Sequence, residues 1–422
     1  MTPRLLTPSL LLIGALSGHA GAAALASENM AADDALSALP PEAMVHRTLA
    51  SLPQLRASTL NIDLAVSNRT RLQAGPHEWS VRTGLYRRTD EAGDRFNEQE
   101  VVVERPLRWF GKAGKDAAIG DKGASMAQAA FEDAWHEAGR ALMKDWFDAL
   151  RELATTAGLD EQQALAARLK NIAEKRFEAG DAAQLDVLQA DTEIRRVAAL
   201  AQQSRLRADQ ALQLLASTYP GLPQPGAAVL PAPSAPRESA TFWFDKITGD
   251  NHELTLARAE ADLALLQAGR AASERMPDPT VGVRVARERG GRENIYGVVI
   301  AFPLPGAARS AEAGSAALKA GIASERLAQT MVKVELAARR LIMEADRNHE
   351  IWQTVQRIAQ QSQRQAATMM TAYELGEVSL AEALNTRRQA HDAALLARSA
   401  QIDALAAHAR LLLDAHLLWS FD

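Results

Sequence analysis

The chain has 422 residues, of which 47 are lysine or arginine and 52 are aspartate or glutamate, so its formal charge is −5. It contains no cysteine, which excludes disulfides, thiolate metal sites and cysteine nucleophiles. Binding to nucleic acid requires a local surplus of basic residues, and the charge balance argues against it. With 47% hydrophobic but only 5% aromatic residues, and an abundance of Ala, Leu, Gln, Glu and Arg, the composition favours long helices.

The first 26 residues have the features of a secretory signal peptide. Arg4 supplies a charged start, Leu5–Leu16 an apolar stretch, and Ala24-Leu25-Ala26 a small-residue cleavage site. The stretch is about 12 residues long, whereas a transmembrane helix needs about 20. We therefore expect a mature protein that leaves the cytoplasm and, having no cysteine, carries no lipid anchor.

Two pairs of amphipathic strands are expected. In the first pair Trp79–Tyr86 alternates in polarity, and Glu100–Glu104 follows a charged loop that contains Asp90, Glu91, Asp94 and Arg95. In the second, Val281–Ala286 is followed by a turn over Arg287–Glu293 and by Ile295–Phe302. Strands of about 8 to 10 residues can cross a bilayer when tilted, but four of them cannot close a barrel. Closure would then require oligomerisation, and the alternative is a soluble four-stranded sheet packed on helices.

Proline is absent between Pro106 and Pro220 and after Pro305, so long helices are allowed in both tracts. A helix from Lys112 to Ala179 and another from Ala308 to Leu375 would each have about 68 residues and a length of roughly 100 Å. In the second helix apolar or small residues recur at spacings of four and three, as in a coiled coil or an ordinary helix bundle. That series is Leu327, Met331, Val334, Ala338, Leu341 and Ala345.

Each long helix is expected to end at a glycine and to turn back. Gly180 and Gly376 suit the left-handed conformation that ends a helix. Asp181 with Gln184, or Ser379 with Glu382, can then cap the returning helix. The expected shorter helices are 181–217, 251–274, 377–415 and 41–74, and the Pro-rich segment 220–236 interrupts the first return.

The second half of the sequence repeats the first. Arg176–Asp181 realigns with Ala372–Glu377, and Val101–Leu107 with Val298–Leu304, at an offset of roughly 196 or 197 residues. Two pairs of matching segments at nearly the same offset indicate that the chain contains two copies of one structural unit. The resulting division is a signal peptide at 1–26, a first repeat at 27–219, a Pro-rich equatorial linker at 220–245 and a second repeat at 246–422.

No enzyme signature is present, so we expect no catalytic residue, no cofactor and no metal ligand. The histidines are scattered, and none shows the two-histidine helical spacing of a zinc protease. Outside the expected signal peptide they are His46, His77, His136, His252, His349, His391, His408 and His416.

The chain resembles the TolC-type outer membrane factors. The resemblance covers nearly the whole mature chain and rests on the duplicated unit, on the tips Arg176-Phe177-x-x-Gly180 and Tyr373-x-x-Gly376, and on the Pro-Leu strand exits at Pro106 and Pro303. It implies a mainly α fold with a β-barrel part, in which a homotrimer forms a 12-stranded barrel in outer-membrane lipid and a helical tunnel through the periplasm of a Gram-negative cell.

The resemblance also implies an efflux function without covalent chemistry. Channels of this family export substrates together with an inner-membrane pump and a periplasmic adaptor protein that contacts the hairpin tips. The Trp109–Lys112 strand exit and the short chain are more similar to the heavy-metal cation efflux subgroup, which implies divalent cations as cargo. The alternatives are a periplasmic coiled-coil adaptor and an outer-membrane duct for type I protein secretion.

The resemblance places the pore aperture just after the tip glycines. It implies that Asp186 and Glu382 form an acidic ring that attracts cations. Tyr373 matches an aromatic gate residue, whereas Val378 replaces a basic one, and Gln189 and Asn385 stand as neutral residues at secondary acidic positions. Two alternatives remain open: Glu382 as the capping partner of Ser379, and Asp186 as an acid favoured by the helix dipole.

Overall fold

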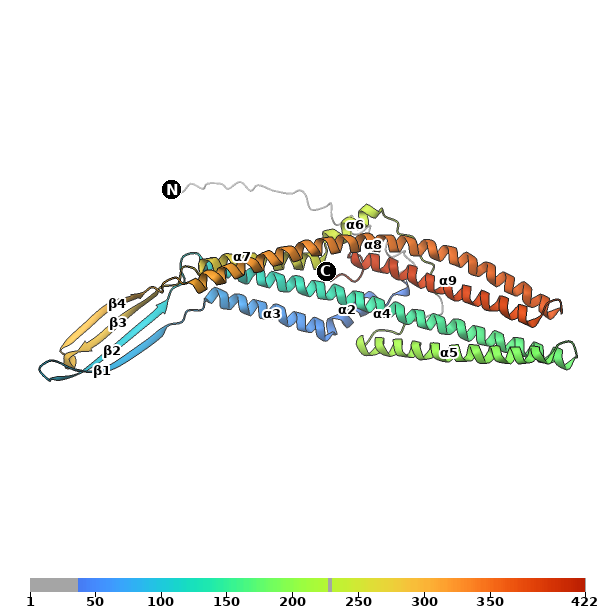
Figure 1. Cartoon of the computed structure of the whole chain (residues 1–422), viewed down its shortest axis with the longest axis horizontal. Coiled ribbons are helices and arrows are strands. Elements are labelled where there is room, and N and C mark those ends of the chain that lie inside the picture. The colour runs from blue at the N-terminus through green and yellow to red at the C-terminus, as the bar shows by residue number, and fades with distance from the viewer. Residues whose placement is uncertain (1–36, 227–229, 422) are drawn as a thin grey trace, which may run out of the picture.

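The computed structural model describes residues 37–226 and 230–421, so the expected signal peptide lies outside the described residues. The molecule is elongated, with four strands at one end and two helical hairpin tips at the other (Figure 1). The strands are β1 (Ser80–Thr89), β2 (Arg95–Pro106), β3 (Thr280–Glu288) and β4 (Glu293–Ala301). The helices are α2 (Glu42–Ser51), α3 (Pro53–Ala74), α4 (Lys112–Glu178), α5 (Gln184–Thr218), α6 (Ala240–Gly249), α7 (His252–Ser273), α8 (Ala307–Glu374) and α9 (Leu380–Asp414), and a short 3-10 turn, η2 (Arg289–Gly291), joins β3 to β4.

The four strands form one antiparallel sheet in the order β1-β2-β3-β4. Val103 is paired with Val81 on one side and with Val283 on the other, and Val283 is paired with Val298. Because side chains alternate along a strand, these valines share one face, and all four are solvent-exposed in the single chain. One face of the sheet is therefore apolar and has no protein partner in the chain.

The opposite face of the sheet is charged. Arg82 pairs with Glu104, and Arg284 pairs with Glu100 at 2.7 Å. The hydroxyl of Tyr86 donates to Glu100 at 3.3 Å, and its ring lies over the position that a Cβ on Gly84 would occupy. The sheet thus separates an apolar surface from an ionic one across a single layer.

The loop expected between the first two strands is shorter in the structure. Arg95 belongs to β2, because the turn closes within the five residues 90–94: Asp90 N donates to the Asp94 carbonyl at 3.0 Å, and Asp94 N donates to Asp90 Oδ1 at 2.9 Å. Gly93 supplies the positive φ of 86° that this turn requires. The second turn is shorter too, since Arg287 and Glu288 extend β3.

The two long helices have the expected bounds within one residue at each end, 67 residues in α4 and 68 in α8. The expected seam on α8 is buried at Val334, Ala338, Leu341 and Ala345. Met331 departs from it with 41% exposure. α3 and α5 pack along α4, α9 packs along α8, and α7 packs on both long helices (Figure 1).

The main hydrophobic core lies halfway along the molecule, where shorter helices meet the long ones. It includes Trp135 and Trp146 of α4 and the C-terminal Trp419, whose carbonyl accepts from Trp135 Nε1 at 3.2 Å. The Pro-rich linker crosses this region, and its expected last residues, 240–245, are helical in α6 because Ser239 caps that helix through Phe242 N.

Within the described ranges, no helix has the length and apolarity to cross a membrane.

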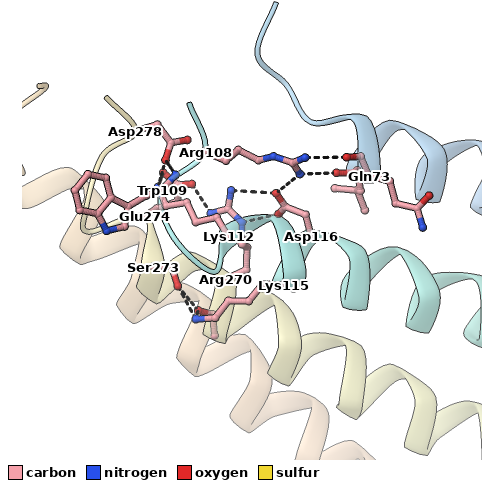
Figure 2. Close-up of polar contacts among 12 residues, drawn as sticks. Gln73, Arg108, Trp109, Lys112, Lys115, Asp116, Arg270, Ser273, Glu274 and Asp278 are labelled. Atoms are coloured by element: carbon pink, nitrogen blue, oxygen red, sulfur yellow. Dashed lines mark hydrogen bonds and ion pairs between the residues drawn. The ribbon is translucent and has the colours of Figure 1, made fainter. Parts of the chain in front are cut away.

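Polar contacts fix the sheet to the helices at the strand exits (Figure 2). Asp278, just before β3, accepts from Trp109 N at 2.9 Å, from Lys112 Nζ at 2.8 Å and from His77 Nε2 at 2.8 Å. Burial opposes ionisation of Asp278, but these donors outweigh it and lower its pKa to about 2. Lys112 is buried and also donates to the carbonyl of Met276 at 2.8 Å.

A buried carboxylate, Asp116, joins three helices at the same level. It pairs with Arg270 of α7 at 2.5 Å and with Arg108 at 3.2 Å. Arg108 also donates to the carbonyls of Leu72 and Gln73 at the end of α3, at 2.9 and 2.8 Å (Figure 2). The sheet therefore cannot tilt on the helices without breaking buried ion pairs.

Candidate functional site

The two hairpin tips have the same backbone structure. After α4, Gly180 N donates to the Phe177 carbonyl at 3.0 Å and Asp181 N to the Arg176 carbonyl at 2.8 Å. After α8, Gly376 N donates to Tyr373 at 3.0 Å and Glu377 N to Ala372 at 2.9 Å. Gly180 and Gly376 have φ of 81° and 80°, which other residues adopt at a cost.

The return helices begin differently. At α9, Ser379 and Glu382 form the expected capping box: Glu382 N donates to Ser379 Oγ at 3.3 Å, and Ser379 N donates to Glu382 Oε2 at 3.0 Å. The hydrogen bonds from Ser379 lower the pKa of Glu382. At α5, the expected cap by Asp181 and Gln184 is wrong, because the capping position is Ala183, which has no side-chain acceptor.

This difference separates the roles of the two acidic residues. Asp186 and Glu382 occupy the same third position of their helices. One oxygen of Glu382 holds the α9 cap, whereas Asp186 faces an alanine at the equivalent capping position. The capping alternative thus describes Glu382, and Asp186, half-buried in the first turn of α5, has the position that the helix-dipole alternative requires.

Arg176 of the first tip is bonded to the second tip. Its Nη1 donates to the Tyr373 carbonyl at 2.5 Å, its Nη2 donates to the Asp181 carbonyl at 3.3 Å, and its guanidinium lies 4.8 Å from the centre of the Tyr373 ring. Tyr373 is 1% exposed, and burial raises its pKa. The two hairpins of one chain are therefore joined at their ends by a cation over a buried aromatic ring.

A small core lies behind this contact and unites all four helices of the two hairpins. Tyr373 packs there with residues of α4, α5 and α9, and Met369, Met370 and Val378 cover it from the side. Its buried members are Leu169, Ala173, Ala190, Tyr373, Leu380, Ala383 and Leu384.

One turn further from the tip, a buried carboxylate links the two return helices. Glu193 of α5 is 3% exposed, accepts from Arg388 of α9 at 2.5 Å and pairs with Arg196 at 2.8 Å. Burial opposes its ionisation, but both arginines outweigh this and lower its pKa. No local sequence pattern marks the pair of Glu193 with Arg388, although Glu193 and Arg196 show the three-residue spacing of a helical ion pair.

The remaining expected site residues lie at the edges of this arrangement. Phe177 is 44% exposed at the first tip, and Asn385 is exposed on α9. Gln189 is half-buried on α5, and its Oε1 is buried without a hydrogen-bond partner among the described residues. Arg176, Tyr373, Gly180 and Gly376 are thus brought together, while Phe177 and Asn385 point to solvent.

The structure also brings together three histidines that are far apart in the sequence. His136, His252 and His416 each offer one ring nitrogen, and these nitrogens lie within 4.8 Å of one another. Burial, together with His136 and His252, lowers the pKa of His416 to about 4. No sequence motif could reveal this group, because its members come from α4, from the start of α7 and from the residues after α9.

Solved structures share the fold at low sequence identity. The CmeC outer membrane channel of Campylobacter jejuni matches all of this chain and 96% of its own, with a TM-score of 0.76 at 14% identity. VceC, an outer membrane protein of Vibrio cholerae, matches 89% of this chain and 94% of its own, with a TM-score of 0.69 at 15% identity. The MtrE outer membrane channel of Neisseria gonorrhoeae, in its open state, matches 90% of both chains, with a TM-score of 0.58 at 15% identity.

No protein-family model and no curated protein sequence matches the chain. The similarity to these solved channels is therefore a similarity of structure. The chain has the fold of the TolC-type outer membrane channels, a mainly helical architecture with a small antiparallel sheet.

Proposed function

We propose that this chain is the outer-membrane channel subunit of a tripartite efflux system, with its strands in the outer membrane and its hairpins in the periplasm. The observation that carries the proposal is the two-faced sheet. Its exposed valines suit contact with lipid, and its opposite face of paired arginines and glutamates suits a water-filled lumen. A soluble protein would cover such an apolar face.

A homotrimer would complete both parts of the channel. β1 and β4 are the edge strands of the sheet, so β4 of one chain can pair with β1 of the next, and three chains would give a closed barrel of twelve strands. Closure leaves no strand edge unpaired in lipid, which is the condition for a strand protein to span a membrane.

The helices have unpartnered apolar side chains on opposite sides of the chain. α8 lies along one side, and α3 and α5 lie along the other (Figure 1). A head-to-tail contact between these two sides closes a ring. The exposed residues include Leu318, Ile322, Val332, Leu336, Met343, Ile351 and Ile358 on α8, Leu60 and Leu64 on α3, and Leu200, Leu206 and Leu214 on α5.

In this proposal the tips close the periplasmic end. Arg176 over Tyr373 and Arg388 on Glu193 hold the two hairpins of each chain together, and Asp186 from three chains would surround the aperture with negative charge. An adaptor protein that binds Phe177 and the exposed tip would open the channel by separating the hairpins. The pump and the adaptor are further parts of the proposal, and the acidic residue at the tip favours divalent metal cations as cargo.

The same arrangement argues against the two alternatives. A periplasmic adaptor would have no use for a sheet with an exposed apolar face, and the similar solved structures are channels. A duct for protein secretion shares the fold. An acidic aperture favours small cations over unfolded polypeptide of mixed charge.

Labelling with a membrane-impermeant maleimide tests the topology, since the natural chain has no cysteine. Glu91→Cys lies in the β1–β2 turn and Asp181→Cys at the first tip. We expect Glu91→Cys to react in intact cells and Asp181→Cys to react only after the outer membrane is permeabilised. The cysteine-free chain is the matched control. If both variants react only after permeabilisation, the protein is wholly periplasmic and the proposal fails.

A further inference from the structure

The three-histidine group lies halfway along the molecule, far from the tips. α7 begins there, and the C-terminal residues that follow α9 end there (Figure 1). His136 projects from α4, His252 is the first residue of α7, and His416 follows α9. The three rings contact one another in pairs, with centroid distances of 5.7 Å for His136–His252, 5.1 Å for His136–His416 and 4.6 Å for His252–His416.

Hydrogen bonding orients the first ring for a ligand. The buried carboxylate of Asp414 is paired with Arg140 at 2.8 Å and with Arg410 at 3.0 Å. A carboxylate only accepts, so the 3.2 Å contact between His136 Nε2 and Asp414 Oδ1 requires a proton on Nε2. A histidine that binds a metal ion does so as the neutral ring, and with the proton on Nε2 the lone pair is on Nδ1. A carboxylate that holds the far nitrogen of a histidine is a common arrangement around metal ligands.

The backbone at His416 gives a second, independent observation. His416 has φ of 56° at the end of α9, where its N–H donates to the Leu413 carbonyl at 3.0 Å and Leu417 N donates to Leu412 at 2.9 Å. Glycine is preferred at this position, as at Gly180 and Gly376. A side chain here costs backbone strain. His416 Nε2 is moreover buried without a hydrogen-bond partner in the described part of the chain.

We propose that His136, His252 and His416 form a binding site for a divalent transition-metal ion of the Zn²⁺ class. Imidazole nitrogens suit Zn²⁺, Co²⁺, Ni²⁺ and Cu²⁺, and three of them leave a fourth position for water. Ligand bonds of about 2.0 Å require nitrogens roughly 3.3 Å apart in a tetrahedral site, so rings within 4.8 Å of one another need small rotations.

The surroundings carry negative charge that a cation would offset. Burial raises the pKa of Asp133, the residue three before His136, and the nearby carboxylates of Glu137 and Glu253 raise it further. His252 has Glu132 beside it, with Nδ1 3.8 Å from Oε2. A bound ion would pin the start of α7 and the C-terminal segment to α4, which is a structural role independent of conduction through the channel.

Metal binding to the untagged, chelator-treated full-length protein in detergent tests the site, with Co²⁺ as the probe. We expect about one Co²⁺ per chain, with the visible absorption bands of a low-coordinate histidine site, and a raised melting temperature. His416→Asn should weaken binding at least tenfold, because Asn also tolerates positive φ and so preserves the backbone. His349→Gln, which removes a histidine of α8 outside the group, should bind like the natural chain.

A second variant keeps the test decisive should His416→Asn fold poorly. His252→Gln removes a ligand at a helix start with ordinary backbone angles, and it should lose binding to a similar extent. The natural chain binding far less than one Co²⁺, or both ligand variants binding as tightly as His349→Gln, would overturn the proposal. Either outcome leaves the channel function untouched.

Discussion

At the scale of single residues, the tips show how one side chain can join two hairpins. Arg176 reaches from the first tip to a backbone carbonyl and a buried ring of the second. The guanidinium suits this role because it is planar, always charged and able to donate in several directions at once. The two acidic residues at the third position of the return helices differ in this respect: Glu382 is bound in a helix cap, and Asp186 is not.

Replacing Arg176 with Gln removes the cation and its bonds to the second tip. A hydrogen bond to a charged group contributes about 1.5 kcal/mol or more, so we expect the open probability of single channels to rise roughly tenfold. Lys175→Gln removes the same charge one residue earlier, at an exposed position, and should leave gating unchanged. Equal open probabilities for the two variants would mean that Arg176 does not hold the tip.

Asp278→Asn tests the joint between the sheet and the helices. The pKa of Asp278 is lowered to about 2 in the folded chain, so its charge stabilises the fold at pH above about 4, and this contribution is lost as pH falls from about 4 to 2. The variant should be less stable at neutral pH by about 2 kcal/mol, because the buried Lys112 loses the nearer of its two charge partners and keeps only Glu274.

The measurement is the melting temperature between pH 7 and pH 2, followed by circular dichroism. The natural chain should lose stability in the acid range more steeply than Asp278→Asn. Asp262→Asn, which breaks an exposed ion pair with Lys122, should cost less than about 1 kcal/mol and keep the natural pH profile. Parallel profiles for the natural chain and Asp278→Asn would contradict the account of the joint.

At the scale of helices and strands, most of the architecture follows from the sequence. The absence of proline from two tracts predicts α4 and α8 nearly to the residue, and alternating valines predict the strands. Details that depend on one residue's local chemistry were missed: β2 begins at Arg95 because Gly93 allows a tight turn, and α5 begins after Ala183 without a side-chain cap. The histidine group and the Glu193–Arg388 pair depend on how distant helices pack, which no local pattern contains.

The two helix starts offer a matched comparison. Ala183 and Ser379 have nearly the same backbone angles, with φ of −79° and −77° and ψ of 151° and 155°. Ala183→Ser should therefore gain a cap and Ser379→Ala should lose one, each by about 1 kcal/mol. Hydrogen exchange of the first-turn amides should slow roughly fivefold in α5 and quicken by a similar factor in α9. Unchanged exchange in both helices would show that the caps do not limit local opening there.

At the scale of the whole molecule, one chain alone leaves strand edges and apolar side chains without a protein partner among the described residues. The sheet has two free edges and an apolar face, and apolar side chains lie along opposite sides of the helices. If three chains form one ring in a membrane, the strand edges pair, the apolar sheet face contacts lipid and the apolar sides of the helices pack on neighbouring chains. The same assembly would bring three copies of Asp186 to one narrow opening, where their charge acts on ions in transit.

Single-channel recording from the purified protein in planar bilayers tests this account most directly. We predict a detergent-stable trimer that conducts and prefers cations under a salt gradient. Asp186→Asn should reduce that preference, whereas Ser379→Ala, which alters the helix cap but not the charge, should retain it. A monomer without conductance, or a channel whose selectivity is the same with and without the Asp186 carboxylate, would contradict the account.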